Sequence, residues 1–310
     1  MSSPETADRQ AIDTRAALIM VVLCAVWGTQ QAIVKLGAAD MSPVLQMAFR
    51  SGVAAIGVFA LARGRGETHW FCRATLIPGI AVGTFFGLEF AFVGEALRYT
   101  SASHVTVYLY SAPILIAVGL GLMHRDERLR AEQWLGVLFS FAGVVVTFLG
   151  RGEPRAYPSM HFGDALALCG ALSWAMTAIV LRSSKLANAP ATVTLFYQLS
   201  GALVLAGSLA AAMGETAVHP TRGLGVSLVW QVLVVAFASY LTWFALLRKY
   251  SSARLGVLSF MTPVFGVAGG VILLGDRIDT GFGLGAMMIL GGIVFATTGL
   301  PRRTRQADLV

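Results

Sequence analysis

The sequence carries little charge. Only 13% of its 310 residues are Asp, Glu, Lys or Arg, against about 25% in a typical soluble domain. Hydrophobic residues make up 56%, and the mean hydropathy is +0.72. Because so few charges cannot coat a water-facing surface, we expect lipid to be the main solvent of this chain. The formal net charge of +7 is then interpreted as membrane topology, and no nucleic-acid partner is expected.

Motifs for nucleotide binding and for hydrolysis are missing. The chain has no Walker A motif, no HExxH and no GxSxG, so ATP does not drive chemistry or transport within it. Its three cysteines, Cys24, Cys72 and Cys169, show neither paired nor metal-binding spacing. No metal or other cofactor is therefore expected. A membrane enzyme would need converging His, Asp and Ser side chains or metal ligands, and the sequence places none at membrane depth.

Long apolar runs dominate the chain instead. A membrane helix needs about 20 mostly apolar residues, and ten segments qualify. They are 16–37, 43–62, 75–97, 102–123, 132–149, 162–183, 190–213, 225–247, 254–274 and 281–300. The sequence thus predicts an all-α membrane protein of ten transmembrane helices, with short tails at 1–15 and 301–310.

The basic residues predict the orientation in the membrane. With the N-terminus inside, 16 Lys and Arg residues fall in inside segments, six fall in outside segments and Arg50 falls within a helix. Lys and Arg accumulate on the cytoplasmic side of membrane proteins. Both tails are therefore predicted to be cytoplasmic.

An internal repeat relates residues 16–149 to residues 162–300. Trp27 matches Trp174 at an offset of 147, and Pro113 matches Pro263 at an offset of 150. Further matches are Pro43 with Pro190, Phe49 with Phe196, Tyr110 with Phe260, Gly136 with Gly285, Gly143 with Gly292, and Glu127-Arg128-Leu129 with Asp276-Arg277-Ile278. Each half holds five helices, an odd number, so the second half is predicted to be inverted. Inverted repeats are typical of secondary transporters; a duplication with a purely structural consequence is the alternative.

These repeated residues also carry a family resemblance. The run Ala25-Val26-Trp27-Gly28, the pair Phe49-Arg50, the mid-helix Pro113, Glu127-Arg128-Leu129 and the glycines that follow resemble the drug/metabolite transporter superfamily, specifically its ten-helix EamA-type members. The overall pattern is similar to that of bacterial aromatic amino acid exporters. The resemblance implies a substrate cavity near the bilayer centre, lined mainly by helices 1, 3, 4, 6, 8 and 9. The second half departs from the pattern, with Tyr197 in place of Arg50.

Two prolines are predicted to interrupt helices. Pro113 and Pro263 lie in the middle of apolar segments, and each frees the carbonyl group four residues earlier, at Leu109 and Ser259. In lipid such groups need another partner, and helix breaks tend to line a cavity. The alternative is a kink that serves packing alone.

Three charged residues are assigned to the predicted spans: Arg50, Glu89 and Glu95. A charge in the bilayer is costly and normally finds a partner. Arg50 and Glu89 each lie about eight residues from the outer end of their helix, or on the order of 12 Å deep, so we predict that they pair. We expect Glu95 to pair with Arg98 or to face water at the outer mouth.

Two interpretations of the Arg50–Glu89 charges are left open. Glu89 could be a proton-coupling acid or the anchor of a substrate amine, with Arg50 as a carboxylate ligand. Alternatively, the two residues could form a structural ion pair. The equivalent positions in the second half hold Tyr197 and Ser239, so no second pair is expected.

Aromatic side chains gather on the helices expected around the cavity. Ring faces suit a flat apolar substrate or a cation, although as lipid-facing bulk they would have no such role. The predicted substrate-binding residues are Trp27, Gln30, Gln31, Phe86, Glu89, Phe90, Tyr108, Tyr110, Trp174, Tyr240, Trp243 and Phe260. His104 is interpreted as an interfacial residue.

The sequence therefore predicts a transporter of the bacterial inner membrane. The leading hypothesis is export of neutral aromatic or large apolar amino acids and related metabolites, by rocking of the two halves around a central cavity. Multidrug or cationic-compound efflux is the alternative. The expected partners are a small-molecule substrate and the lipid bilayer, and the chain could act as a monomer.

Overall fold

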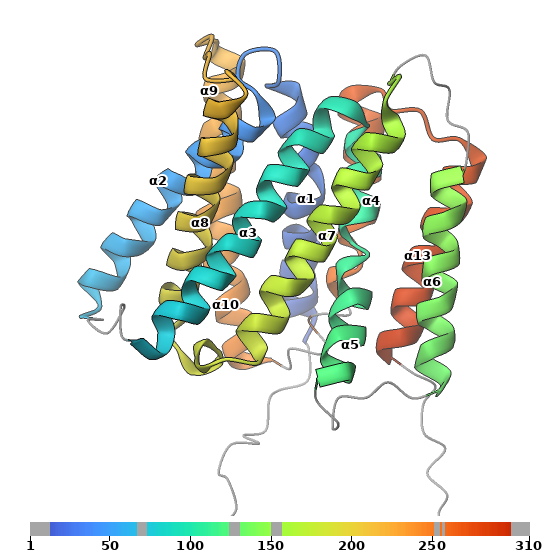
Figure 1. The fold of residues 1–310 in the computed structure, drawn as a ribbon, viewed down its shortest axis with the longest axis horizontal. Coiled ribbons are helices and arrows are strands. Elements are labelled where there is room, and N and C mark those ends of the chain that lie inside the picture. Colours follow the sequence, from blue (N-terminus) through green and yellow to red (C-terminus); the bar gives the residue numbers. More distant parts are fainter. Residues whose placement is uncertain are drawn as a thin grey trace, which may run out of the picture.

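The computed structural model describes residues 13–66, 73–123, 131–149, 157–250, 255 and 258–298. These ranges are helical, without a named strand (Figure 1). The helices are α1 (Thr14–Leu36), α2 (Pro43–Gly64), α3 (Arg73–Tyr99), α4 (Ala102–Leu109), α5 (Ala112–Met123), α6 (Ala131–Leu149), α7 (Met160–Arg182), the 3₁₀ turn η2 (Lys185–Asn188), α8 (Ala191–Ala212), α9 (Arg222–Val229), the π-helical η3 (Trp230–Ser239), α10 (Tyr240–Lys249), α12 (Thr262–Gly269), the π-helical η4 (Gly270–Leu274) and α13 (Thr280–Thr298).

Seven of these helical stretches are long and apolar enough to cross a membrane. They are Thr14–Leu36, Pro43–Gly64, Ala74–Tyr99, Ala102–Met123, Met160–Arg182, Ala191–Ala212 and Arg222–Trp243. Three shorter apolar helices, Gln133–Thr147, Thr262–Leu274 and Thr280–Phe295, fall where the other predicted spans lie. The prediction of an all-helical membrane protein is thereby confirmed. The count of ten spans and the inversion of the halves stay predictions.

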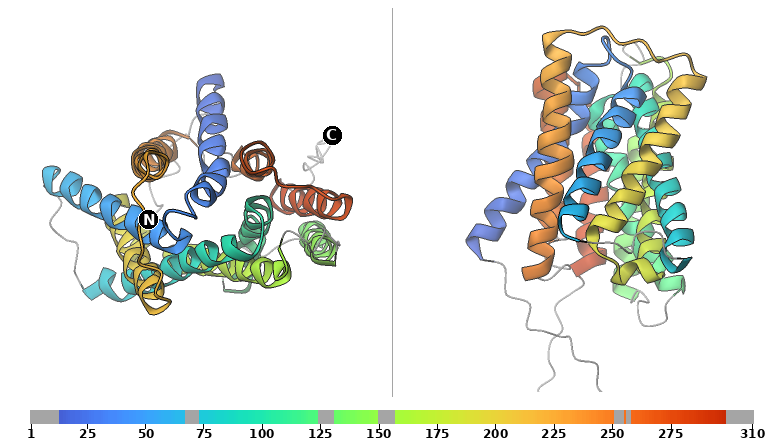
Figure 2. Two further views of the ribbon diagram at one scale, coloured as in Figure 1. Left: turned by 90° about the horizontal axis from the view of Figure 1, so that it is seen from above. Right: turned by 90° about the vertical axis from the view of Figure 1, so that its left-hand side faces the viewer.

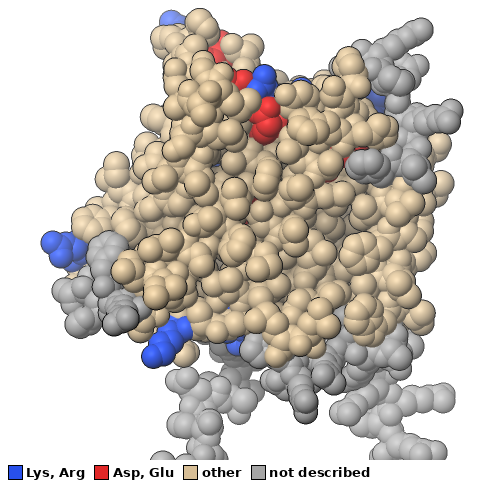
Figure 3. Space-filling view, in the orientation of Figure 1, with Lys and Arg blue, Asp and Glu red and all other residues tan. Residues whose placement is uncertain are grey.

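Charge on the molecular surface follows the same logic. On the face shown in Figure 3, the coloured Lys, Arg, Asp and Glu side chains lie toward the two ends of the bundle, with uncharged residues between them. Large apolar side chains are exposed on several helices, among them Ile56, Ile80, Leu138 and Ile272. Such a belt matches the hydrocarbon core of a bilayer. α1 begins and α13 ends at the same end of the bundle (Figure 1); the tails predicted at 1–15 and 301–310 lie outside the described residues, apart from residues 13–15.

The helices pack as a layered bundle. α3 packs against both α7 and α8, α2 packs against α8, and α1 packs against α12. α6 and α13 form a close pair at the side of the molecule, seen on the right of the left-hand view in Figure 2. Partners far apart in the sequence therefore hold the bundle together.

Glycines set the closest of these approaches. A Cβ atom on Gly83 would lie 2.5 Å from the carbonyl oxygen of Tyr197, and one on Gly87 would lie 2.5 Å from that of Gly201. Gly79 lies against the ring of Tyr197. Gly79, Gly83 and Gly87, each four residues from the next on one face of α3, thus form a packing stripe against α8. Small residues at helix crossings allow such backbone contact in lipid.

A buried amide network ties the end of α1 to its neighbours. Gln46, fully buried on α2, donates from Nε2 to the carbonyl oxygens of Val34 (3.0 Å) and Met41 (2.8 Å). Its Oε1 accepts from Nε2 of Gln231 at 2.9 Å, and Gln231 also donates to Ser227 at 3.1 Å. One side chain thus links the end of α1, the connection that follows it and η3.

Replacing Gln46 by leucine is expected to lower the stability of the protein. The buried carbonyl group of Met41 would lose the donor that Gln46 supplies, and the amide of Gln231 would lose one of its two acceptors. A buried polar group left without a partner costs about 1–3 kcal/mol. The thermal unfolding midpoint in detergent measures the effect. Gln198→Leu, at a half-buried position of α8 outside this network, is the matched control. An unchanged midpoint for Gln46→Leu would show that the network does not contribute.

Candidate functional site

The two repeated prolines coincide with breaks in helices. α4 ends at Leu109 and α5 begins at Ala112, so the span turns at Tyr110 and Ser111, directly before Pro113. α12 begins at Thr262, one residue before Pro263. The first break lies in mid-span, because α4 and α5 together form one membrane-crossing segment.

Arg50 is buried on α2 without the predicted ion pair. Its guanidinium donates to Oε1 of Gln30 at 3.2 Å and to Sδ of Met47 at 3.2 Å, and it lies over the ring of Phe90 at 4.8 Å. The direct Arg50–Glu89 pair predicted from the sequence is wrong, because the two side chains, both in the described part of the chain, do not come within 4.0 Å. The guanidinium contacts the amide of Gln30 and the ring of Phe90 instead.

Glu89 lies close by on α3. It is 7% exposed, and its Oε2 has no hydrogen-bond partner. Arg50, Tyr110 and Tyr240 are near enough to interact with it electrostatically. We call Gln30, Arg50, Glu89, Tyr110 and Tyr240 the central cluster. Its members come from α1, α2, α3, the break after α4 and the start of α10.

Two aromatic pairs adjoin the central cluster. The indole Nε1 of Trp27 donates to Oγ of Ser239 at 2.8 Å, and its ring meets Trp243 edge-on at 5.5 Å. Trp174 meets Tyr110 edge-on at 5.4 Å. The repeated tryptophans therefore hold equivalent tasks, each packing against an aromatic ring of another helix.

The structure distributes the remaining predicted residues. The rings of Phe86 and Phe90 on α3 pack in a tilted arrangement with their centres 4.4 Å apart, within the core that Trp174 also contacts. Gln31 is 3% exposed, and its Oε1 lacks a partner. Tyr108 lies instead beside Asp164, and Phe260 packs with the α6–α13 core. The structure thus places Tyr108 and Phe260 outside the central cluster.

A second buried polar group was missed from the sequence. Nδ1 of His104 lies 3.0 Å from Oδ1 of Asp164, which also accepts from Oγ1 of Thr100 at 2.7 Å. His104 is 5% exposed and stacks on Phe282 at 4.1 Å, so at the start of α4 it is packed inside the bundle. Asp164 is 1% exposed. Its place inside the predicted span 162–183 was the signal that could have revealed it.

Charged residues at one end of the bundle also join the helices. Arg98 pairs with Glu95 at 3.2 Å, as predicted, and additionally with Glu215 in the connection after α8. Lys35, at the end of α1, donates to the carbonyl oxygen of Thr100. These contacts connect α1, α3 and the α8–α9 connection at one end of the bundle.

Asp276 joins the same end of the molecule. Its Oδ2 accepts from the backbone amide of Ser103 at 3.0 Å and from its hydroxyl at 2.8 Å, which fixes the start of α4 to the end of η4. Lys35 lies over the ring of Tyr157 at 4.3 Å. Burial, and secondarily the charge of Asp276, raises the pKa of Tyr157. The aspartate therefore has a structural task at this end; its repeat partner Glu127 lies outside the described residues.

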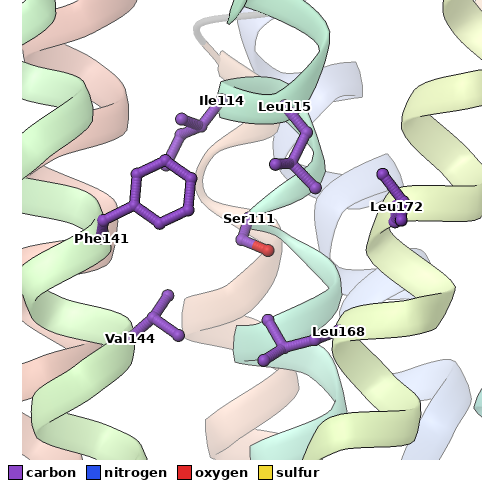
Figure 4. Close-up of a pocket in the computed structure, with 7 residues that line it drawn as sticks. All are labelled: Ser111, Ile114, Leu115, Phe141, Val144, Leu168 and Leu172. Atoms are coloured by element: carbon purple, nitrogen blue, oxygen red, sulfur yellow. The ribbon is translucent and has the colours of Figure 1, made fainter.

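A separate pocket of about 260 Å³ lies between α5, α6 and α7. Ile114, Leu115, Phe141, Val144, Leu168 and Leu172 surround it, and Ser111 supplies its one hydroxyl (Figure 4). That hydroxyl donates to the carbonyl oxygen of Tyr108 at 2.7 Å. Its lining suits a hydrocarbon chain and lacks charged side chains, so it is distinct from the central cluster.

Comparison with known proteins gives a family match over most of the chain. The model described as the EamA-like transporter family matches residues 14–149 and again residues 161–298. A solved crystal structure with 22% sequence identity superposes with a TM-score of 0.64, covering 94% of this chain and 99% of that chain. At this identity the likeness concerns the fold alone.

Three named relatives are similar over most of their lengths. A probable amino-acid metabolite efflux pump of Salmonella typhimurium is 29% identical over 303 residues, 94% of this chain and 97% of that protein. The aromatic amino acid exporter YddG of Ancylobacter novellus is 26% identical over 250 residues, 78% of this chain and 83% of that protein. A probable amino-acid metabolite efflux pump of Escherichia coli is 27% identical over 297 residues, 92% and 94% of the two chains.

Proposed function

Because the chain belongs to the EamA-like transporter family, within the drug/metabolite transporter superfamily, we propose that it exports neutral aromatic or large apolar amino acids and related metabolites. It is a multi-pass membrane transporter. The proposed mechanism is alternating access to the central cluster from the two sides of the bilayer. No chemical step on the substrate is required.

The α6–α13 contact supports ten spans in two opposed halves. At the repeat offset of 149, Gly136 is equivalent to Gly285 and Gly143 to Gly292. A Cβ atom on Gly143 would lie 2.7 Å from the carbonyl oxygen of Gly285, and one on Gly292 would lie 2.5 Å from that of Gly136. Replacing each glycine by its repeat equivalent turns the first contact into the second, as expected for two segments related by a two-fold axis.

A hydrogen bond between equivalent positions agrees with that axis. Oγ of Ser140 donates to the carbonyl oxygen of Ile289 at 3.0 Å, and the two residues are 149 positions apart. The family model also matches the chain twice, over 14–149 and 161–298. Both observations support the proposed halves 16–149 and 162–300 and an inverted repeat of the kind found in secondary transporters.

The distribution of basic residues supports cytoplasmic tails. Sixteen Lys and Arg residues against six favour the N-terminus inside. The named relatives above come from bacteria. We therefore place the protein in a bacterial inner membrane, with the direction of export pointing away from the tails.

One observation carries the substrate proposal: a buried arginine and a buried glutamate lie near each other among aromatic rings without being paired. Aromatic side chains provide apolar surface for a large side chain. The relatives named as amino-acid efflux proteins agree with this substrate class.

Flux measurements on reconstituted protein test the proposal. We expect counterflow of labelled phenylalanine, tryptophan and leucine well above that of protein-free liposomes, with and without an imposed pH gradient. Flux of quaternary cations without flux of any of these amino acids would contradict it.

Efflux of cationic compounds is the second candidate, and the unpartnered carboxylate oxygen of Glu89 favours it. A glutamate in the bilayer can bind an organic cation or a proton. On this alternative Glu89→Gln abolishes transport of the cation, and amino acids neither move nor compete.

A further inference from the structure

Arg50 has more hydrogen-bond donors than the protein satisfies. A guanidinium carries five N–H donors, and Arg50 is 3% exposed. It donates to the amide oxygen of Gln30 and to the thioether sulfur of Met47, and sulfur is a weak acceptor. The face of the group is covered by Phe90. A carboxylate is the ligand that best fits the remaining donors, because it accepts two parallel hydrogen bonds.

Glu89 lacks a hydrogen-bond donor, whereas Arg50 lacks acceptors. Its buried Oε2 accepts no hydrogen bond. An ionised carboxylate accepts only, and burial without a donor is costly. An ammonium group, with three donors, would satisfy it.

The separation of the two charges decides between a structural pair and a binding site. A structural pair repays the desolvation of both ions only through direct contact and satisfied hydrogen bonds. The guanidinium of Arg50 lies 4.8 Å from the ring centre of Phe90, the residue that follows Glu89 in α3, but none of its nitrogens comes within 4.0 Å of the Glu89 carboxylate. A molecule that carries both opposite charges can contact both side chains at once.

We propose that Arg50 binds the carboxylate and Glu89 the ammonium group of one zwitterionic amino acid. This inference rests on the proposed function and assigns the two ends of the substrate. The aromatic members Tyr110 and Tyr240 of the central cluster, and Trp174 against Tyr110, then lie beside the amino acid's side chain.

The second half of the repeat supports a single site per chain. The position equivalent to Arg50 is Tyr197, whose ring packs against Gly79. The position equivalent to Glu89 is Ser239, which accepts from Trp27. Both equivalents make packing or hydrogen-bond contacts, so one zwitterion binds per chain.

Three ligands that differ by one charged group test the assignment. Phenylalanine, phenethylamine and 3-phenylpropanoate share a phenyl ring; the second lacks the carboxylate and the third lacks the amine. We expect wild-type protein to bind phenylalanine about tenfold to hundredfold more tightly than either analogue, the size of one charge-assisted contact. Competition against phenylalanine counterflow gives the affinities.

Substitution of each charge should then remove one preference. Arg50→Gln should weaken the binding of phenylalanine and of phenylpropanoate by about tenfold to hundredfold and leave the binding of phenethylamine unchanged. Glu89→Gln should weaken the binding of phenylalanine and phenethylamine by a similar factor and leave the binding of phenylpropanoate unchanged. Arg98→Gln and Glu95→Gln make the same chemical changes in the outer ion pair and should leave all three affinities unchanged. The double variant Arg50→Gln/Glu89→Gln leaves no lone buried charge, which favours folding, and should bind the three ligands alike.

The outcomes separate the inference from the proposed function. Suppose that wild-type protein transports phenylalanine and that every variant lowers the affinity for all three ligands by the same factor. This result would overturn the zwitterion assignment alone. Wild-type protein that binds phenethylamine and transports no amino acid would overturn both.

Discussion

Replacing Gly201 by leucine is expected to prevent the protein from accumulating in a folded form. A side chain at this position of α8 would project into the backbone of α3 at Gly83, where the carbonyl group leaves no room for a Cβ atom. Overpacking in a core costs about 1–3 kcal/mol when side chains can adjust, and more when they cannot. Here the obstacle is backbone, so the helices must separate along their whole crossing.

Gly225→Leu is the matched control for Gly201→Leu. Gly225 lies in α9, and a Cβ atom there would meet nothing within 4 Å. Yield of monodisperse protein after detergent extraction, read by size-exclusion chromatography, compares the two. Equal yields would show that the α3–α8 crossing can open without loss of the fold.

Replacing His104 by leucine is expected to cause the second large effect. The substitution leaves the buried carboxylate of Asp164 with Thr100 as its remaining hydrogen-bond donor in this group. Removing one partner from a buried ionisable pair costs about 3–5 kcal/mol, because the other group stays behind uncompensated. The thermal unfolding midpoint in detergent should fall accordingly.

The double variant His104→Leu/Asp164→Leu separates pairing from packing. Replacing both partners of a buried pair by apolar residues is often neutral or stabilising. We therefore expect the double variant to be more stable than His104→Leu. A double variant that is as unstable as the two single losses combined would mean that the stacking of His104 on Phe282, and not the pair, holds α4 in place.

Hydropathy and spacing predicted the fold well, because lipid imposes a simple demand. A helix that crosses a bilayer must be long and apolar, so the spans could be read along the chain. The four-residue spacing of Gly79, Gly83 and Gly87 predicts helix packing, because residues four apart share one helix face. Neither rule, however, identifies the partner helix, and α8 had to be found from the structure.

The polar contacts were predicted less well, for a geometric reason. Counting residues from a helix end gives the depth of Arg50 and Glu89 but not the direction in which each side chain points. Depth correctly placed the two residues near each other, but the guanidinium contacts Gln30 and Phe90 and not Glu89.

The buried contact between His104 and Asp164 was not predicted for another reason. Both residues lie near helix ends, where a polar residue is ordinarily solvated. The fold covers these ends with neighbouring helices and with Phe282. Burial of a helix end depends on the tertiary arrangement, which residue spacing along one helix does not reveal.

The seam between α3 and α8 has a consequence for how the protein can move. α3 belongs to the first half and α8 to the second, and their backbones touch at Gly83, Gly87 and Gly201. If each half swung as a whole, this seam would break in every transport cycle. We infer that α2, α3, α7 and α8 travel together as one body drawn from both halves, and that the broken helices at Pro113 and Pro263 supply the joints.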